Sequence, residues 1–294
     1  ELLALSDEDE DRGLKEFDTH FWKHVGHSLT NAFRCFVRGW TGGMAAPAPK
    51  NAAFIGHWRQ LSRFASAFAL VADLSLLTLG GALKRKEMLS ARLGDILSEL
   101  YLLGAVLKRF EVEGRPEVDR PIVEFIMQKG YNRMSLAFEG VLDNLPARWA
   151  AAVTRVLAFP LGVPFQEPSD ELTSEVAAIL MRPSSQRDRL TPDIYLGEGH
   201  AEHPVKDLEL AFELVTEAAP IEKKMREAKM RDPAEARDAG VITDAEFDRL
   251  AEAKAAVDKV VAVDAFPMAD VSPIASQHDR NRTGGDETHR EAAE

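Results

Sequence analysis

The sequence predicts an all-α protein: an antiparallel helical bundle with a smaller helical C-terminal extension and a disordered tail. Apolar residues recur at steps of three and four through most of the 294 residues, which is the spacing of one face of an α-helix. No segment combines period-two alternation with β-branched enrichment, so no strand is predicted. Short glycine and proline breaks separate the periodic segments, and long helices joined by short turns favour an antiparallel bundle.

The bundle is expected over residues 18–197. Helix-breaking residues delimit five predicted helices at about 17–40, 54–79, 83–110, 122–145 and 147–159. Ser169 is predicted to cap a sixth, which ends before Pro183. In the first helix, the apolar residues draw one stripe, the pattern of a helix that packs one face against a core: Phe21, Val25, Leu29, Phe33, Phe36, Val37 and Trp40.

Three further segments complete the predicted organisation. Residues 1–17 form an acidic N-terminal segment, 198–263 a helical extension, and 264–294 a tail without apolar period. In the extension, helices are predicted at about 204–219 and 220–231, each opening with a proline. The run from Thr243 to Glu246 reads as a capping box that opens a last helix to about Val263.

Charge and cysteine content bound the function. The net charge is −12, and a mildly basic middle lies between acidic ends, which gives no indication of nucleic-acid binding. Cys35 is the only cysteine, so no disulfide can form within the chain and a cytoplasmic location is the default. No signal peptide is visible, and the first residue is Glu1, which suggests a processed chain or a piece of a longer one.

Local motifs give little support for an enzyme. His20, His24 and His27 share one helical face and offer a hypothetical zinc site, but surface or packing histidines are the favoured interpretation. Cys35 lies among apolar residues, which favours a buried and unreactive thiol. Glu139 precedes a glycine, as one flavoenzyme family places its base, yet it falls on the polar side of its predicted helix. The common nucleotide-binding, serine-hydrolase and zinc-protease motifs are absent.

One segment approaches the length of a membrane span. Residues 65–83 are almost continuously apolar. Asp73 lies at the centre, where a carboxylate costs about 2.5–3.5 kcal/mol on insertion scales, so a bundle core or subunit interface is favoured. The basic cluster Lys84, Arg85 and Lys86 follows and could bind anionic lipid or a phosphate-bearing ligand, but the favoured interpretation is a solvated helix start or a salt-bridged turn.

Several blocks of sequence closely resemble the C-terminal domain of bacterial-type acyl-CoA dehydrogenases. The longest is Leu77-Thr-Leu-Gly-Gly-Ala-Leu-Lys-Arg-Lys-Glu-Met-Leu-Ser-Ala-Arg-Leu-Gly-Asp-Ile-Leu-Ser-Glu-Leu-Tyr101. Others are Ala105 to Pro116, Phe159-Pro-Leu-Gly162, Pro168 to Leu172, Pro220 to Lys224, His24-Val-Gly-His27 and Asn31-Ala-Phe-Arg34. The resemblance covers about residues 18–262.

This resemblance implies a part of a flavin enzyme of fatty-acid β-oxidation that converts acyl-CoA to trans-2-enoyl-CoA with FAD. The family's catalytic glutamate lies in a V-E-G-A-N-like segment, which is expected upstream of Glu1, so no catalytic residue and no metal site is assigned in this chain. FAD is expected to bind mainly to that upstream part. The segment itself is expected to be structural or oligomerising and inactive alone.

The expected partners of the full enzyme are acyl-CoA, an electron-transfer acceptor and further copies of itself. Peripheral contact with the inner membrane is an added expectation. The alternative from another class is a helical module for membrane docking or protein interaction, with the basic middle as its contact surface.

Overall fold

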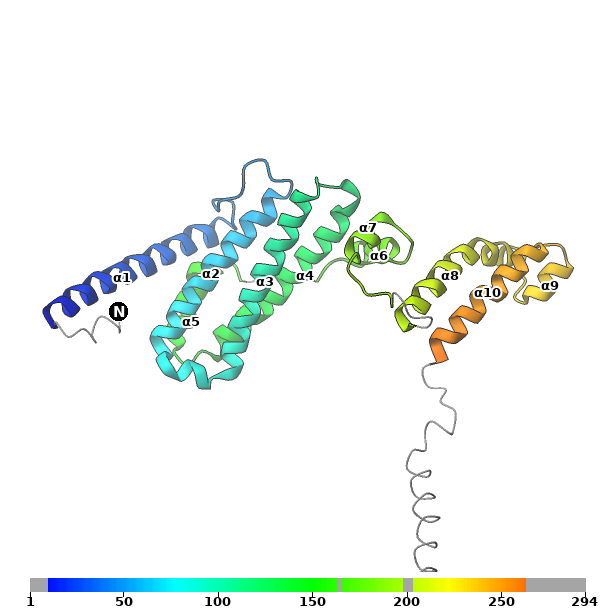
Figure 1. The fold of residues 1–294 in the computed structure, drawn as a ribbon. Coiled ribbons are helices and arrows are strands. Elements are labelled where there is room, and N and C mark those ends of the chain that lie inside the picture. Colours follow the sequence, from blue (N-terminus) through cyan, green and yellow to red (C-terminus); the bar gives the residue numbers. More distant parts are fainter. Residues whose placement is uncertain (1–9, 163–164, 166, 198–202, 263–294) are drawn as a thin grey trace, which may run out of the picture. The chain divides into compact units, whose positions relative to one another are not determined.

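The computed structural model describes residues 10–162, 165, 167–197 and 203–262, and this part of the chain is helical without strands, as the sequence predicts (Figure 1). It divides into two compact units, Glu1–Leu180 and Met181–Glu294. The first unit thus ends before residue 197, the expected end of the bundle. Arg187 pairs with Glu209 and lies over the Phe212 ring, and these contacts join residues 181–197 to the second unit. The tail expected at 264–294 lies outside the described residues.

The first unit is a bundle of long helices joined by short turns. Its helices are α1 (Glu10–Trp40), α2 (Ile55–Leu79), α3 (Glu87–Val112), α4 (Arg120–Asn144), α5 (Arg148–Ala158) and α6 (Asp170–Leu180), with short 3₁₀ segments η2 (Gly80–Arg85) and η3 (Glu117–Asp119). Helices α2, α3 and α4 run side by side in Figure 1. The predicted Ser169 cap is present, since its hydroxyl accepts from the Leu172 N–H at 3.2 Å.

Aromatic rings fill the centre of this bundle. Phe64 of α2 has no exposed surface and contacts four other rings, those of Tyr131, Phe138, Phe159 and Phe165. Aliphatic side chains from α3 and α4 surround them and are also fully buried: Ile96, Leu103, Leu107, Met127, Met134, Val141 and Leu142. Burial of this apolar area is the main favourable term in the stability of the unit.

Helix α2 with η2 is the one segment in the described residues that is long and apolar enough to cross a membrane. In this structure it packs against α1, α3 and α5. Asp73, the charge at its centre, accepts a hydrogen bond from the Ser28 hydroxyl of α1 at 3.3 Å. That bond gives the carboxylate a polar partner within the bundle, as a core helix requires.

Helix α1 departs from the prediction in two ways. It begins at Glu10, so part of the acidic segment 1–17 is helical. Its apolar stripe does not face the core, because Leu29 and Phe33 are each 67% exposed. The face that packs against α2 and α5 instead carries small or polar residues: Ser28, Asn31, Ala32, Cys35 and Gly39. The predicted orientation of this helix was therefore wrong.

The second unit is built on an antiparallel helix pair. Its helices are α7 (Ser185–Leu190), α8 (Pro204–Glu227), α9 (Pro233–Asp238) and α10 (Asp244–Val261). Ion pairs join the start of α8 to the end of α10, Asp207 with Lys259 at 2.8 Å, and the end of α8 to the start of α10, Lys224 with Glu246. The core is small: Ile221, Met225, Ala236 and Ile242.

Two predictions in this unit have opposite outcomes. The capping box is confirmed, with the Thr243 hydroxyl accepting from the Glu246 N–H at 3.2 Å and Glu246 accepting from the Thr243 N–H at 2.9 Å. The helix break at Pro220 is wrong, since α8 continues through it. Proline removes only one intrahelical hydrogen bond, and Ala218, Ile221 and Met225 keep the buried face continuous across that position.

Candidate functional site

A polar cluster at the start of α2 is the clearest constellation of chemistry-bearing side chains in the first unit. His57 Nε2 lies 2.8 Å from Glu124 Oε2, and His57 Nδ1 lies 3.2 Å from the Tyr131 hydroxyl. Tyr131 also donates to the His57 carbonyl at 3.1 Å, and Gln128 donates to Glu124 at 2.7 Å. Helix packing brings these residues together, since His57 is on α2 and the others are on α4.

The cluster lines a cavity of about 590 Å³. Phe54 and Phe165 add aromatic walls, and the first turn of α2 borders it. Phe54 gives that turn no side-chain cap. The hydrogen bond from His57 lowers the pKa of Glu124, while burial raises the pKa of Tyr131, so the cavity holds a carboxylate and a protonated phenol. Both ring nitrogens of His57 already have partners within the cluster, so Glu124 is the charged group that this cavity presents.

The sequence did not predict this cluster. Residue 57 is far from 124 and 131 in the chain, and only the packing of α2 against α4 places them within hydrogen-bonding distance. One signal was available: Glu124 and Tyr131 are seven residues apart, which places a carboxylate and a phenol on one face of a helix.

The predicted histidine triad does not converge on a site. His20, His24 and His27 are all exposed on α1, and His27 Nε2 lies 2.9 Å from the Asn31 amide of the same helix. No group of three His, Cys, Asp or Glu residues suited to a metal ion occurs within the described ranges. The zinc hypothesis thus has no support from a second helix.

Cys35 is 1% exposed. Burial raises its pKa to about 12, although Arg63 and Arg38 act in the opposite direction. A thiol protonated to this extent is a poor nucleophile. Cys35 is therefore a small packing residue between α1 and its neighbours, in agreement with its apolar sequence context.

Two other sequence candidates lie on the surface. Glu139 is exposed on α4, Lys84 and Arg85 are exposed at the end of η2, and Lys86 is exposed directly before α3. Leu77 is 75% exposed and Met88 72%, and these residues flank the basic cluster on either side in the chain. The end of the α2–α3 hairpin thus combines cations with apolar side chains, a pairing typical of surfaces that contact anionic lipid.

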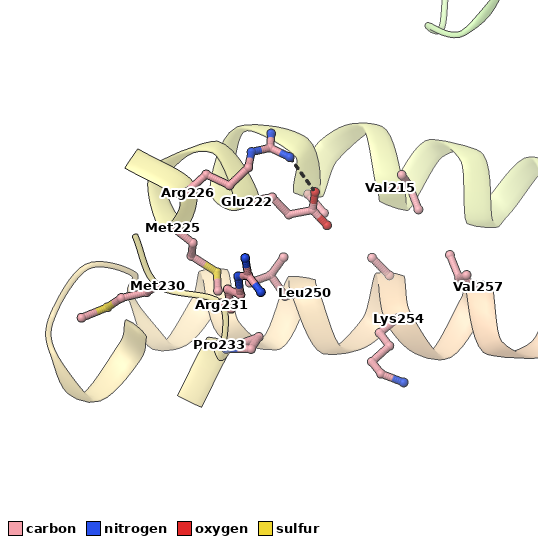
Figure 2. Close-up of a pocket in the computed structure, with 12 residues that line it drawn as sticks. Val215, Glu222, Met225, Arg226, Met230, Arg231, Pro233, Leu250, Lys254 and Val257 are labelled. Atoms are coloured by element: carbon pink, nitrogen blue, oxygen red, sulfur yellow. Dashed lines mark ion pairs between the residues drawn. The ribbon is translucent and has the colours of Figure 1, made fainter. Parts of the chain in front are cut away.

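A second cavity, of about 470 Å³, lies between α8 and α10 (Figure 2). Met225 and Leu250 face each other across the space between the two helices, and most of the lining is aliphatic. Three cations stand among the lining residues, Arg226, Arg231 and Lys254, and Arg226 lies 4.0 Å from Glu222. This lining suits an apolar group and offers no acid–base pair.

Neither cavity fits a flavin dinucleotide. The cavity beside His57 presents the ionised carboxylate of Glu124, which would repel a pyrophosphate. The cavity between α8 and α10 has no aromatic wall and no glycine-rich turn to hold phosphates. The described residues therefore assign no flavin-binding side chain.

Comparison with known families identifies this chain's family. A family model described as "Acyl-CoA dehydrogenase, C-terminal, bacterial type" matches residues 1–266, which includes both helical units up to the end of α10. No solved structure matches the chain. The sequence blocks, the helical architecture and the span of this match agree, and the chain belongs to the bacterial-type acyl-CoA dehydrogenase C-terminal family.

Proposed function

We propose that this chain serves as the helical C-terminal part of an FAD-dependent acyl-CoA dehydrogenase. The full enzyme would convert acyl-CoA to trans-2-enoyl-CoA, the first step of fatty-acid β-oxidation, and pass electrons to a separate acceptor. The observation that supports this proposal is the family match over residues 1–266. Within the enzyme, the segment stabilises the assembly and contributes to contacts between subunits.

The chemistry of the reaction supports a structural role for the segment. Removal of the α-proton of a thioester needs a carboxylate base held in a pocket next to the substrate. Glu139 is exposed on the surface of α4, and Glu124 is held by His57 and Gln128. Neither carboxylate is free and sheltered in the way that a base requires, which supports the proposal that another part of the enzyme supplies the base.

The test uses the protein as its own cell makes it. An affinity tag is added to the protein at its native gene, and the purified protein is assayed for bound flavin and for acyl-CoA-dependent dye reduction. Both are expected to co-purify with the tagged chain. A tagged protein that carries no flavin and reduces no dye with any acyl-CoA would contradict the proposal.

A second candidate function is docking on an anionic membrane surface, with a location at the cytoplasmic face of the inner membrane. It is favoured by the exposed cluster Lys84, Arg85 and Lys86 next to exposed Leu77 and Met88. Near such a surface each cation contributes about 1 kcal/mol, so three cations together raise binding roughly 100-fold.

Vesicle sedimentation tests this candidate. The triple replacement of Lys84, Arg85 and Lys86 by Gln is expected to remove most binding to vesicles that contain anionic lipid. The matched control replaces Lys206, Lys223 and Lys229, three exposed lysines of the second unit, by Gln, and should bind as the parent does. Binding that resists high salt, or that both triple variants keep in full, would exclude docking by this cluster.

A further inference from the structure

Helix α1 presents a row of large apolar side chains to solvent. Trp22, Leu29 and Phe33 are each 67% exposed, Trp40 is 57% exposed and Phe36 41%. We name these five residues the α1 seam. In the described part of the first unit, α1 packs against α2 and α5 through its other face.

The packing of that other face explains why the seam is left outside. Gly39 sits so close to α5 that a Cβ atom there would meet the Leu157 carbonyl oxygen at 2.3 Å. Asn31 and Cys35 are buried on the same side. The small side chains let α1 approach its neighbours closely, and the bulky residues necessarily point away.

The spacing of the seam is that of a helix that pairs with another helix. With Gly26 included, its positions are 22, 26, 29, 33, 36 and 40, with alternating steps of four and three. Apolar residues at this 3.5-residue period form the contact strip of a coiled coil. None of these six positions, from Trp22 to Trp40, holds a charged residue.

Helix α5 widens this surface. Trp149, Val153 and Val156 form an outward stripe and are 56%, 39% and 57% exposed. The Trp40 indole N–H donates to the Val156 carbonyl oxygen at 3.0 Å, so the two stripes meet there. Eight half-exposed side chains of this size present on the order of 800 Å² together, which is the area that each partner buries in a standard interface.

The seam is complementary to itself. When two copies of α1 run antiparallel with their midpoints at Asn31, Trp22 faces Trp40 of the second copy and Leu29 faces Phe33. In the same register, Phe36 faces Gly26, whose side is open because nothing lies within 4 Å of the position of a Cβ atom. Lys23, the flanking cation, falls opposite Gly39 and meets no like charge.

We infer that the α1 seam is the contact surface of a homodimer in which α1 pairs antiparallel with α1 of a second copy, flanked by α5 from each. Such an interface is isologous: each copy uses the same patch, and a two-fold axis relates them. This inference rests on the proposed function, which assigns subunit contacts to the segment, and it names the surface that makes them.

The first test measures the mass of the 294-residue chain in solution by light scattering or sedimentation. A dimer is expected at micromolar concentration. Phe33→Glu places a charge in the middle of the seam and is expected to weaken association at least 100-fold. Leu77→Glu, at a residue that is 75% exposed on α2, is the matched control and should leave the dimer intact. A parent chain that stays monomeric at all concentrations overturns the inference.

The second test fixes the register by disulfide cross-linking. Leu29→Cys and Phe33→Cys chains are oxidised separately and as a mixture, in a Cys35→Ala background so that only the introduced thiols react. The mixture is expected to cross-link at least ten-fold faster than either variant alone, because residues 29 and 33 face each other in the antiparallel pair. A mixture that cross-links no faster than either variant alone would overturn the antiparallel register.

Failure here is separable from failure of the proposed enzyme. A monomeric chain that nevertheless co-purifies with flavin and dehydrogenase activity in its native form would refute the seam and leave the proposed function standing. The alternative is that the α1 seam contacts lipid, which is tested by comparing the vesicle binding of the Phe33→Glu chain with that of the parent. If the parent is monomeric and Phe33→Glu abolishes its vesicle binding, the seam contacts lipid and the pairing is wrong.

Discussion

The two units of the chain are stabilised by different means. In the first unit, a large cluster of buried side chains runs through α2, α3, α4 and α5, with Phe64 in contact with four other rings. In the second unit, four residues form the core, and ion pairs and helix caps supplement it. Small cores give marginal stability, so local interactions carry a larger share in the second unit.

This contrast has a convenient spectroscopic consequence. All four tryptophans lie in the first unit, at positions 22, 40, 58 and 149. Tryptophan fluorescence therefore reports unfolding of the first unit alone, whereas circular dichroism reports the helices of both. Each prediction below names the unit whose transition should move.

The largest effect is expected from the aromatic core. Phe64→Ala removes a fully buried ring and leaves a cavity among four aromatic neighbours. It should lower the free energy of unfolding of the first unit by about 3–5 kcal/mol, measured by tryptophan fluorescence in urea. Leu77→Ala, at an exposed position on the same helix, should change it by no more than about 0.5 kcal/mol. Similar losses from both would show that α2 does not organise the core.

The next effect concerns the small core of the second unit. Ile221→Ala truncates a side chain that is 4% exposed and should cost about 2–4 kcal/mol. Because that unit has little stability to lose, the helical signal should fall at low urea while the tryptophan signal keeps its midpoint. A shift of both signals together would indicate that the two units unfold as one.

A smaller effect tests the helix cap. Thr243→Ala removes the hydroxyl that accepts from the Glu246 N–H and should destabilise the second unit by about 1 kcal/mol. Thr216→Ala is the control, since its hydroxyl bonds within α8 to the Phe212 carbonyl and caps no helix end. Equal destabilisation by the two variants would argue against a role of the cap.

The smallest effect is a pH dependence in the first unit. The hydrogen bond from His57 lowers the pKa of Glu124, so the folded state favours the carboxylate. The resulting stability is present above the pKa of the unfolded carboxyl, about 4.3, and is lost as the pH falls through the lower folded value. Because the Glu124 side chain is 38% exposed, solvent screens the interaction, and its contribution to the free energy of unfolding is much smaller than that of a fully buried pair.

Thermal unfolding of the parent and of Glu124→Gln between pH 7 and 3 checks this sign. The parent should lose stability more steeply than the variant below about pH 4.3. Glu139→Gln, an exposed glutamate on the same helix, should follow the parent curve. A variant that loses stability as steeply as the parent would show that the His57–Glu124 bond does not form.

Much of the fold was predictable because hydrophobic periodicity and turn chemistry are local signals. The Ser169 cap, the Thr243 capping box and the break at Asn144 to Pro146 were all placed correctly. The continuation of α8 through Pro220 was not, because packing against α10 outweighs one lost hydrogen bond. Whether a helix continues through a proline depends on tertiary contacts, which local sequence patterns do not reveal.

The α1 seam and the His57 cluster were missed for related reasons. Periodicity identified the apolar stripe of α1 but could not say whether the chain itself or a second molecule covers it. The close approach at Gly39 turns the stripe away from α5, and it depends on the position of α5. The pairing of His57 with Glu124 likewise depends on how α2 and α4 align.

Our central proposal is that this chain supplies architecture to a flavin enzyme and no flavin chemistry of its own. The most direct measurement is the flavin content and acyl-CoA-dependent dye reduction of the purified chain of residues 1–294. We expect a folded, helical, colourless protein without activity. A yellow protein that reduces dye when acyl-CoA is added would contradict it.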